Sequence, residues 1–325
     1  MKTVNALLSI VIPSHNEAVG IQHSIKEIEN VAKKCSIAYE IIVVDDGSND
    51  GTYEKVIELV KQGKHTLKAI KLSRNFGKEA AILAGLTNAK GDCVITIDAD
   101  LQHPPEIIPE MIAAWKDGAH IVSAVKDNRS KDSFIVRLRA KLFNALLSSL
   151  GGIDIRHSSD FKLLDREVVN VICYQFPEKI RFYRGLTDWV GFNHQVIPFT
   201  VASRNAGEGK WTLGSLIELA ATAIISFTSA PLRIITILGS ITLVFGFIVA
   251  ADALWNWFND EAVSGFTTTI GTLLILGSFI MISLGIIGEY IAKIYDEIKA
   301  RPAYLIEDKQ GFSQEPAEST PFENS

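Results

Sequence analysis

Residues 93–100 read Cys-Val-Ile-Thr-Ile-Asp-Ala-Asp, and this stretch decides how the N-terminal part of the chain folds. Its first five residues are apolar or β-branched, which favours a buried strand, and two carboxylates follow directly. Comparable runs predict strands at 7–13, 39–46 and 67–72 before it and at 119–125 after it. The second of these also ends on acids, so acidic groups are expected where two strands finish.

Between these strands, the apolar residues recur with helical spacing. Alternating strands and helices predict an α/β fold with a mainly parallel, three-layer Rossmann-like sheet. Ligands of such sheets bind beyond the carboxyl ends of the strands, where Pro13, Asp46 and Asp98 fall. The expected helices span residues 17–34, 52–62, 78–89 and 105–116.

Two long uncharged runs follow, at 234–251 and 262–288. As helices they would measure roughly 27 and 40 Å, against a bilayer hydrocarbon core of about 30 Å. Two such runs in tandem are rare in soluble cores, so two transmembrane helices are predicted. Residues 211–228 carry a single charge, Glu218, and are expected to form an interfacial helix leading onto the membrane.

Charges around the two runs predict their orientation. The linker 259–261 has no Lys or Arg, whereas basic residues flank the pair on both sides. The positive-inside rule therefore places both termini and the catalytic domain in the cytosol, on the inner face of a cell membrane. The expected organisation is a catalytic domain, interfacial helices, two spans and a cytosolic acidic tail, at residues 1–210, 211–230, 231–292 and 293–325.

Composition narrows the possible partners. The formal net charge of −5 comes mostly from the last twenty residues, and no large basic surface suggests nucleic-acid binding. Three widely spaced cysteines form no metal-binding pattern and suit a reducing compartment. The N-terminal apolar run is too short for a signal peptide, so none is expected. Glycines in the two long runs permit close helix packing, either within the pair or in a homo-oligomer such as a tetramer.

The acids after the strands suggest a cation site. Asp98 and Asp100 can share a hard cation such as Mg²⁺ or Mn²⁺, and the amide oxygen of Gln102 lies nearby in sequence. The bare Asp-x-Asp pattern is as often a solvated turn. Asp46 could accept hydrogen bonds from a nucleotide or cap the next helix. His103 is expected to be an ordinary loop residue outside the site.

Several motifs together resemble the glycosyltransferases of family 2, and within it the polyprenyl-phosphate branch, which includes bactoprenol glucosyltransferases and dolichol-phosphate mannose synthases. The resemblance covers about residues 5–300. It rests on residues 12–17 (Ile-Pro-Ser-His-Asn-Glu), 45–48 (Asp-Asp-Gly-Ser), 74–78 (Arg-Asn-Phe-Gly-Lys), 98–105 (Asp-Ala-Asp-Leu-Gln-His-Pro-Pro), 159–161 (Ser-Asp-Phe), 181–185 (Arg-Phe-Tyr-Arg-Gly) and 204–210 (Arg-Asn-Ala-Gly-Glu-Gly-Lys).

The resemblance implies a GT-A fold and a role for each matching position. Asp100 and Gln102 would ligate the Mg²⁺ or Mn²⁺ ion. Asp160 occupies the place of the proposed catalytic base, and Asp100 is its catalytic partner through the metal. Phosphates of the donor or acceptor would meet Arg129, Arg204 and Lys210. The nucleotide-sugar would contact Pro13, Ser14, Glu17, Asp46, Lys78, Asp98 and Ala99.

The implied reaction is inverting transfer of a hexose from a nucleotide-sugar to polyprenyl phosphate. UDP-glucose and undecaprenyl phosphate are favoured, and a GDP-mannose-dependent enzyme is the alternative. Ser14-His15 and Gly209 depart from the mannose synthase pattern, which leaves the base and sugar open. A processive polysaccharide synthase is disfavoured, because an N-terminal span and a QxxRW-type motif are lacking. A membrane scaffold or flippase partner without activity is the remaining alternative.

Overall fold

The computed structural model describes residues 6–63, 66–126, 159–176, 178, 182–199, 230–259 and 265–312. The chain divides into two compact units. Within these described ranges, one unit contains every strand and the helices around them, and it includes the chain from residue 302 onward. The other contains the two long C-terminal helices.

An eight-stranded sheet in the order β7-β5-β6-β4-β1-β2-β3-β8 forms the first unit. Strand β1 pairs in parallel with β2 on one side and β4 on the other, and β2 pairs in parallel with β3. At the other edge β5 and β7 are parallel. The expected mainly parallel sheet is thus confirmed. The bounds are Leu7–Ser14 (β1), Ala38–Asp45 (β2), Leu67–Leu72 (β3), Cys93–Thr96 (β4), Ile121–Lys126 (β5) and His194–Phe199 (β7).

Two strands run against the others, and neither was expected from the sequence. Strand β6 (Lys162–Asp165) inserts between β4 and β5 and is antiparallel to both. Strand β8 (Ile306–Gln310) pairs antiparallel with β3 at the sheet edge. Residues 306–310 therefore belong to the sheet and not to a separate acidic tail. Their charges are used there, because Asp308 accepts a hydrogen bond from the Tyr53 hydroxyl at 2.9 Å.

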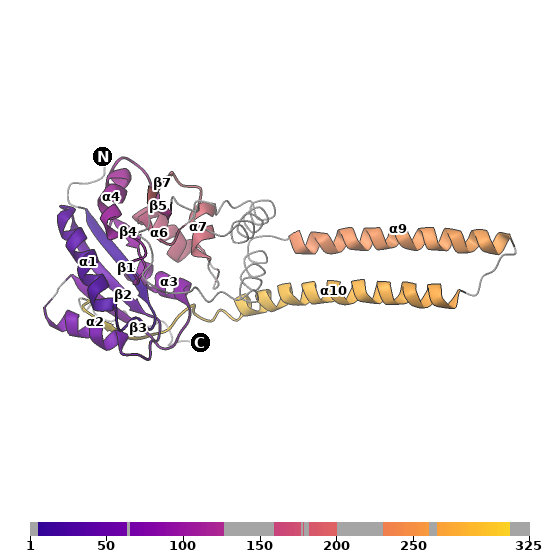
Figure 1. Ribbon diagram of the computed structural model, residues 1–325, viewed down its shortest axis with the longest axis horizontal. Helices are drawn as coiled ribbons and strands as arrows, with labels where there is room; N and C mark the ends of the chain where they lie inside the picture. Colours follow the sequence, from indigo (N-terminus) through magenta and orange to yellow (C-terminus); the bar gives the residue numbers. More distant parts are fainter. Residues whose placement is uncertain are drawn as a thin grey trace, which may run out of the picture. The chain divides into compact units, whose positions relative to one another are not determined.

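Helices cover both faces of the sheet, and β1 shows why. Leu8, Ile10 and Ile12 face one apolar core with α1, α2 and α4, while Val11 faces a second core with α3, α6 and α7. This alternation is the two-residue period of a strand buried on both faces. Figure 1 shows α1 and α3 on opposite sides of β1 and β2. The helices are α1 (Ile21–Lys34), α2 (Thr52–Lys61), α3 (Lys78–Asn88), η1 (Pro105–Ile107), α4 (Ile108–Lys116), α6 (Arg166–Asn170), the π-helical turn η3 (Val171–Gln175) and α7 (Tyr183–Trp189).

Two boundary differences matter for the site. Helix α1 begins at Ile21, four residues later than expected, because residues 17–20 form a turn closed by the Gly20 N–H and the Glu17 carbonyl at 3.0 Å. Strand β4 ends at Thr96, so Asp98 lies in the loop beyond the strand. Both changes lengthen the loops at the carboxyl edge of the sheet and leave Glu17 and Asp98 outside regular structure.

The second unit contains α9 (Ala230–Phe258) and α10 (Phe266–Ile298) (Figure 1). Both are long and apolar enough to cross a membrane, over Ile235–Asn256 and Thr269–Ile298. Six glycines lie on these helices, and a Cβ at any of them would meet no atom within 4 Å. Contact between α9 and α10 therefore does not depend on the glycines. The interfacial helix expected at 211–228 lies outside the described residues.

Candidate active site

A pocket of about 220 Å³ opens at the carboxyl edge of the sheet. It lies where β1, β2 and β4 end and α3 begins, as expected for a parallel sheet. Eight of the residues that the sequence singled out line it together: Pro13, Ser14, Glu17, Asp46, Lys78, Asp98, Ala99 and Asp100. Loops far apart in the chain are thus brought into one polar cavity.

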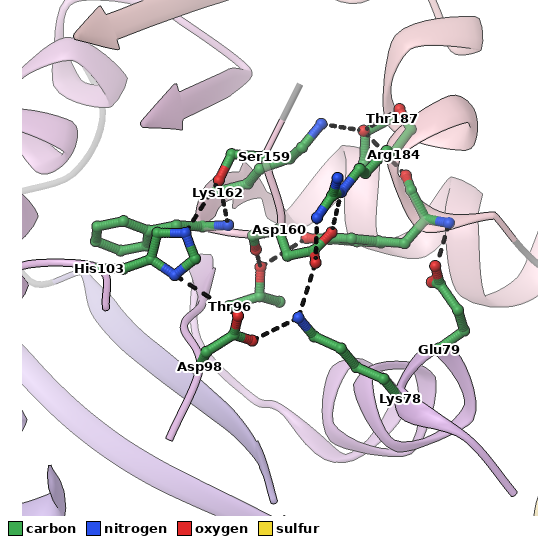
Figure 2. Close-up of polar contacts among 12 residues, drawn as sticks. Lys78, Glu79, Thr96, Asp98, His103, Ser159, Asp160, Lys162, Arg184 and Thr187 are labelled. Carbon is green, nitrogen blue, oxygen red and sulfur yellow. Dashed lines mark hydrogen bonds and ion pairs between the residues drawn. The ribbon is translucent and has the colours of Figure 1, made fainter. Parts of the chain in front are cut away.

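At one side of this pocket, four charged side chains form a continuous chain of contacts (Figure 2). The Lys78 ammonium lies 2.7 Å from a carboxylate oxygen of Asp98 and 2.7 Å from one of Asp160. Arg184 donates to both oxygens of Asp160, from Nε at 2.6 Å and from Nη2 at 2.8 Å. Asp160 is thereby held by two cations, one from α3 and one from α7.

These contacts fix the protonation of Asp160. Burial on its own would raise the pKa of Asp160, but the hydrogen bonds and charges of Arg184 and Lys78 outweigh it and hold that pKa well below its usual range. For Lys78, burial acts to lower the pKa, and the two carboxylates reverse this and raise it. Asp160, Lys78 and Arg184 are therefore ionised at neutral pH, and Asp160 is a poor proton acceptor.

Asp46 also has a structural role beside the pocket. Its side chain is buried, and its two oxygens accept the backbone N–H groups of Phe76 and Gly77 at 2.7 and 2.8 Å. Those residues immediately precede α3, so Asp46 fixes the position of the first residue of α3, Lys78. The capping alternative thus applies to the loop before α3 and not to the helix that follows Asp46 in sequence.

Gly47 explains how the two loops come so close. Its φ of +65° lies in the left-handed region, and a Cβ there would meet the Arg74 carbonyl carbon at 2.4 Å and the Asn75 nitrogen at 2.6 Å. Only glycine fits between these backbone segments. The resulting contact holds the loop after β2 against the loop that leads into α3 and Lys78.

His15 separates the pocket from a second polar cavity of about 470 Å³. Its Nδ1 lies 2.9 Å from the Asp46 carbonyl, and its Nε2 lies 3.0 Å from the Asn75 amide nitrogen. These contacts are satisfied together when Nδ1 carries the proton and Nε2 accepts. The second cavity extends to Lys71, Arg74 and Glu307 of β8, so the C-terminal strand contributes to its wall.

The expected metal ligands are only partly brought together. Asp100 lines the pocket and accepts the backbone N–H of Gln102 at 3.0 Å, while Gln102 is exposed and is absent from the pocket lining. Within the described ranges, no three acidic, His or Cys side chains group into a metal site by themselves. Burial, followed by the charges of Asp100, Asp50 and Asp98, raises the pKa of Glu17. A divalent cation fits this electronegative end, with hard oxygen ligands to receive it.

Three further residues at the site were not identified as site residues from the sequence. Arg184 falls in a matching motif, but it had no assigned role. His103 lies between the rings of Phe161 and Phe199, and its Nδ1 is 3.6 Å from Asp98, so it packs beside the charged cluster and is not an ordinary loop residue. Glu79 follows Lys78 and binds α7. Arg129, Arg204 and Lys210 lie outside the described residues.

Comparison with known proteins shows the family to which the chain belongs. Residues 9–173 match Glycosyl transferase family 2, and residues 230–294 match the GtrB C-terminal hairpin. A glycosyltransferase of Synechocystis described as uncharacterized is 39% identical over 96% of this chain and 98% of its own. An Escherichia coli protein named prophage bactoprenol glucosyl transferase homolog is 36% identical, over 92% of this chain and 98% of its own.

Among solved structures, mannosyl-3-phosphoglycerate synthase from Rubrobacter xylanophilus superposes with a TM-score of 0.50. The match covers 70% of this chain and 74% of that one at 22% identity, and it supports the GT-A fold alone. The sequence relatives extend over almost the whole chain, including both long helices. The chain therefore belongs to glycosyl transferase family 2 and is a glycosyltransferase with a GtrB-type C-terminal hairpin.

Proposed function

We propose that this glycosyltransferase moves glucose from UDP-glucose to a polyprenyl phosphate, undecaprenyl phosphate being favoured. The transfer is a single displacement at the anomeric carbon with inversion, at the cytosolic face of the inner membrane. The names of its relatives support the acceptor, since several are called bactoprenol glucosyl transferase. Two helices able to cross a bilayer support a lipid acceptor as well.

The observation that carries the proposal is the Asp98–Lys78–Asp160–Arg184 chain of contacts beside the pocket. A lipid phosphate has a second pKa near 6, so it is already mostly dianionic at about pH 7. It needs an oriented approach more than a general base. Asp160, ionised and fixed by Lys78 and Arg184, orients reactants and the two cations. The cations also offset repulsion between the two phosphorylated substrates.

Mg²⁺ or Mn²⁺ is the proposed cofactor, held by Asp100 with the amide oxygen of Gln102, and Asp98 stays with Lys78. When bound, the ion supplies positive charge to the leaving diphosphate. Two protein ligands leave most positions of an octahedral ion for phosphate oxygens and water, which is typical of Mg²⁺ sites. Glu17 closes the electronegative end of the pocket.

The proposal is tested with the full-length protein in lipid nanodiscs containing undecaprenyl phosphate, Mg²⁺ and labelled sugar donor. Labelled lipid is expected with UDP-glucose, with a β linkage from the α-linked donor. Label from GDP-mannose alone would replace the donor assignment by the mannosyltransferase alternative. A folded protein that labels no lipid from either donor would support the inactive scaffold.

Asp100→Asn is expected to raise the Mg²⁺ concentration needed for half-maximal activity by at least roughly tenfold, because a charged metal ligand is lost. Chelation with EDTA should abolish wild-type activity, and added Mg²⁺ or Mn²⁺ should restore it. Titration of activity against each ion measures both effects. Asp50→Asn is the control, since Asp50 accepts hydrogen bonds from Ala18 and Thr52 and does not line the pocket. An unchanged metal requirement in Asp100→Asn would remove Asp100 as a ligand.

A further inference from the structure

Glu79 is a partly buried acid that the mechanism above does not use. It follows Lys78 in the first turn of α3, and its carboxylate points toward α7 (Figure 2). There it accepts the backbone N–H of Tyr183, the first residue of α7, at 3.0 Å. Two adjacent residues of α3 therefore contact two different parts of the same cluster.

The contacts close into a ring of five residues. Lys78 binds Asp160, Asp160 binds Arg184, Arg184 follows Tyr183 in the chain, and Tyr183 binds Glu79, which follows Lys78. The ring is anchored to the sheet. Thr96 of β4 donates to the backbone carbonyl of Asp160 at 2.6 Å, and its hydroxyl lies 2.9 Å from that of Tyr183.

We propose that Glu79 is a positioning residue for the transfer reaction: by holding the first residue of α7 it places the Arg184 guanidinium against Asp160. The catalytic consequence of this assignment rests on the proposed function. Its structural consequence, the position of α7, rests on the geometry alone. Tyr183 is buried, so its N–H would lack an equally good acceptor without Glu79. The Arg184 side chain is 43% exposed and has room to swing away once α7 loosens.

Ionisation of Glu79 makes the strength of its hydrogen bond to Tyr183 depend on pH. Burial, followed by the charge of Asp160, raises the pKa of Glu79 to about 7. Above that pH the carboxylate accepts a charge-assisted hydrogen bond from Tyr183, which is stronger than the bond to a neutral carboxyl. The charged groups facing Glu79 are Lys78 on its own helix, Asp160 before β6, Lys162 in β6 and Arg184 in α7. Burial lowers the pKa of Lys162 to about 8, which is close to that of Glu79. Substitution of Glu79 is therefore needed to assign a titration in this range to one of the two groups.

Global stability has to be considered apart from the position of α7, because the raised pKa of Glu79 affects stability whichever role the residue has. A folded-state pKa of about 7 against the ordinary 4.5 means that the native state binds the proton more tightly than the unfolded state. Ionising Glu79 therefore lowers global stability as the pH rises from about 4.5 to about 7. A purely structural residue would make Glu79→Gln the more stable protein at pH 8 with no change in α7. A positioning residue makes α7 looser in the same variant.

The test uses full-length protein in nanodiscs and compares the wild type with Glu79→Gln, Glu79→Ala and a matched control. The control is Asp92→Asn, because Asp92 accepts the backbone N–H of Leu7 at 2.8 Å away from the site. Hydrogen exchange of residues 183–189 at pH 8 is measured by mass spectrometry, and kcat is followed from pH 5.5 to 9.

At pH 8, Glu79→Gln should exchange these amides several-fold faster than the wild type and Glu79→Ala roughly tenfold faster, while Asp92→Asn leaves them unchanged. The wild-type kcat should fall below about pH 7, and in Glu79→Gln this acid limb should move down to near pH 6, where the acceptor phosphate itself takes up a proton. Wild-type exchange together with a wild-type pH profile in both Glu79 variants would overturn the proposal. If the wild type transfers no sugar at all, the proposed function fails, and the exchange comparison still decides the position of α7.

Discussion

Asp160→Asn should lower kcat by at least roughly a hundredfold. Loss of one preorganised charged group at a reacting centre typically removes about 3 kcal/mol of transition-state stabilisation, which is about a hundredfold in rate. The neutral amide leaves two cations facing each other, and its NH₂ group cannot accept from either. Steady-state kinetics at saturating donor and acceptor measure the loss.

The pH dependence of this variant decides the role of Asp160. Because Lys78 and Arg184 keep Asp160 ionised and weakly basic, its loss should persist at every pH at which the protein is folded. Recovery of activity at high pH would show that Asp160 removes a proton. Glu40→Gln is a suitable control, since Glu40 is a buried carboxylate bound to Lys68 at 2.5 Å outside the site. It should lower the melting temperature without lowering kcat of the folded protein.

Among additions of a single methyl group to the loops around the pocket, Gly47→Ala is expected to lower the free energy of unfolding most. The new Cβ would lie under 3 Å from three backbone atoms of Arg74 and Asn75, so one of the two loops must move. Left-handed strain and overpacking each cost about 1–3 kcal/mol, so a loss on the order of 3 kcal/mol is expected. Thermal and denaturant unfolding measure it.

Gly63→Ala separates the two causes of that loss. Gly63 also has a positive φ, +83°, but a Cβ there would meet nothing within 4 Å. It should therefore show the conformational penalty alone, roughly 1 kcal/mol, and leave catalysis unchanged. Gly47→Ala should in addition raise the KM for the nucleotide-sugar, because Asp46 and the start of α3 move with the loop. Equal stability losses in the two variants would contradict the steric explanation.

The sequence predicted β1 to β5 because apolar residues predominate in and around each of them. Strand β6 escaped because only two of its residues, Leu163 and Leu164, are apolar. They are flanked by Asp165 and by Lys162, whose ammonium lies 2.5 Å from the Thr187 hydroxyl. Strand β8 escaped because it is polar. Its position depends on pairing with β3 and on contacts from Tyr53 and Lys71. Because β8 is stabilised by pairing with a strand far away in the chain, residues 306–310 show no apolar pattern of their own that predicts a strand.

The candidate site, too, was predicted where local motifs identify it and missed where it depends on contacts between distant residues. The motifs after β1, β2 and β4 met in one pocket, since the ends of parallel strands share an edge. Glu79 could not have been singled out, because its partner is a backbone N–H 104 residues away. Asp46 was recognised as important, but its contacts with Phe76 and Gly77 are also to backbone, which carries no residue-specific signal.

Strand β8 has a consequence for how the protein is made. Domains generally begin to fold as they emerge from the ribosome, N-terminal part first. Here the last strand of the sheet is synthesised only after both α9 and α10. The sheet is therefore incomplete at the β3 edge until α9 and α10 have been synthesised. In the proposed membrane topology, the chain crosses the bilayer an even number of times between β7 and β8, because both strands belong to one sheet. Insertion of both α9 and α10 then precedes completion of the sheet.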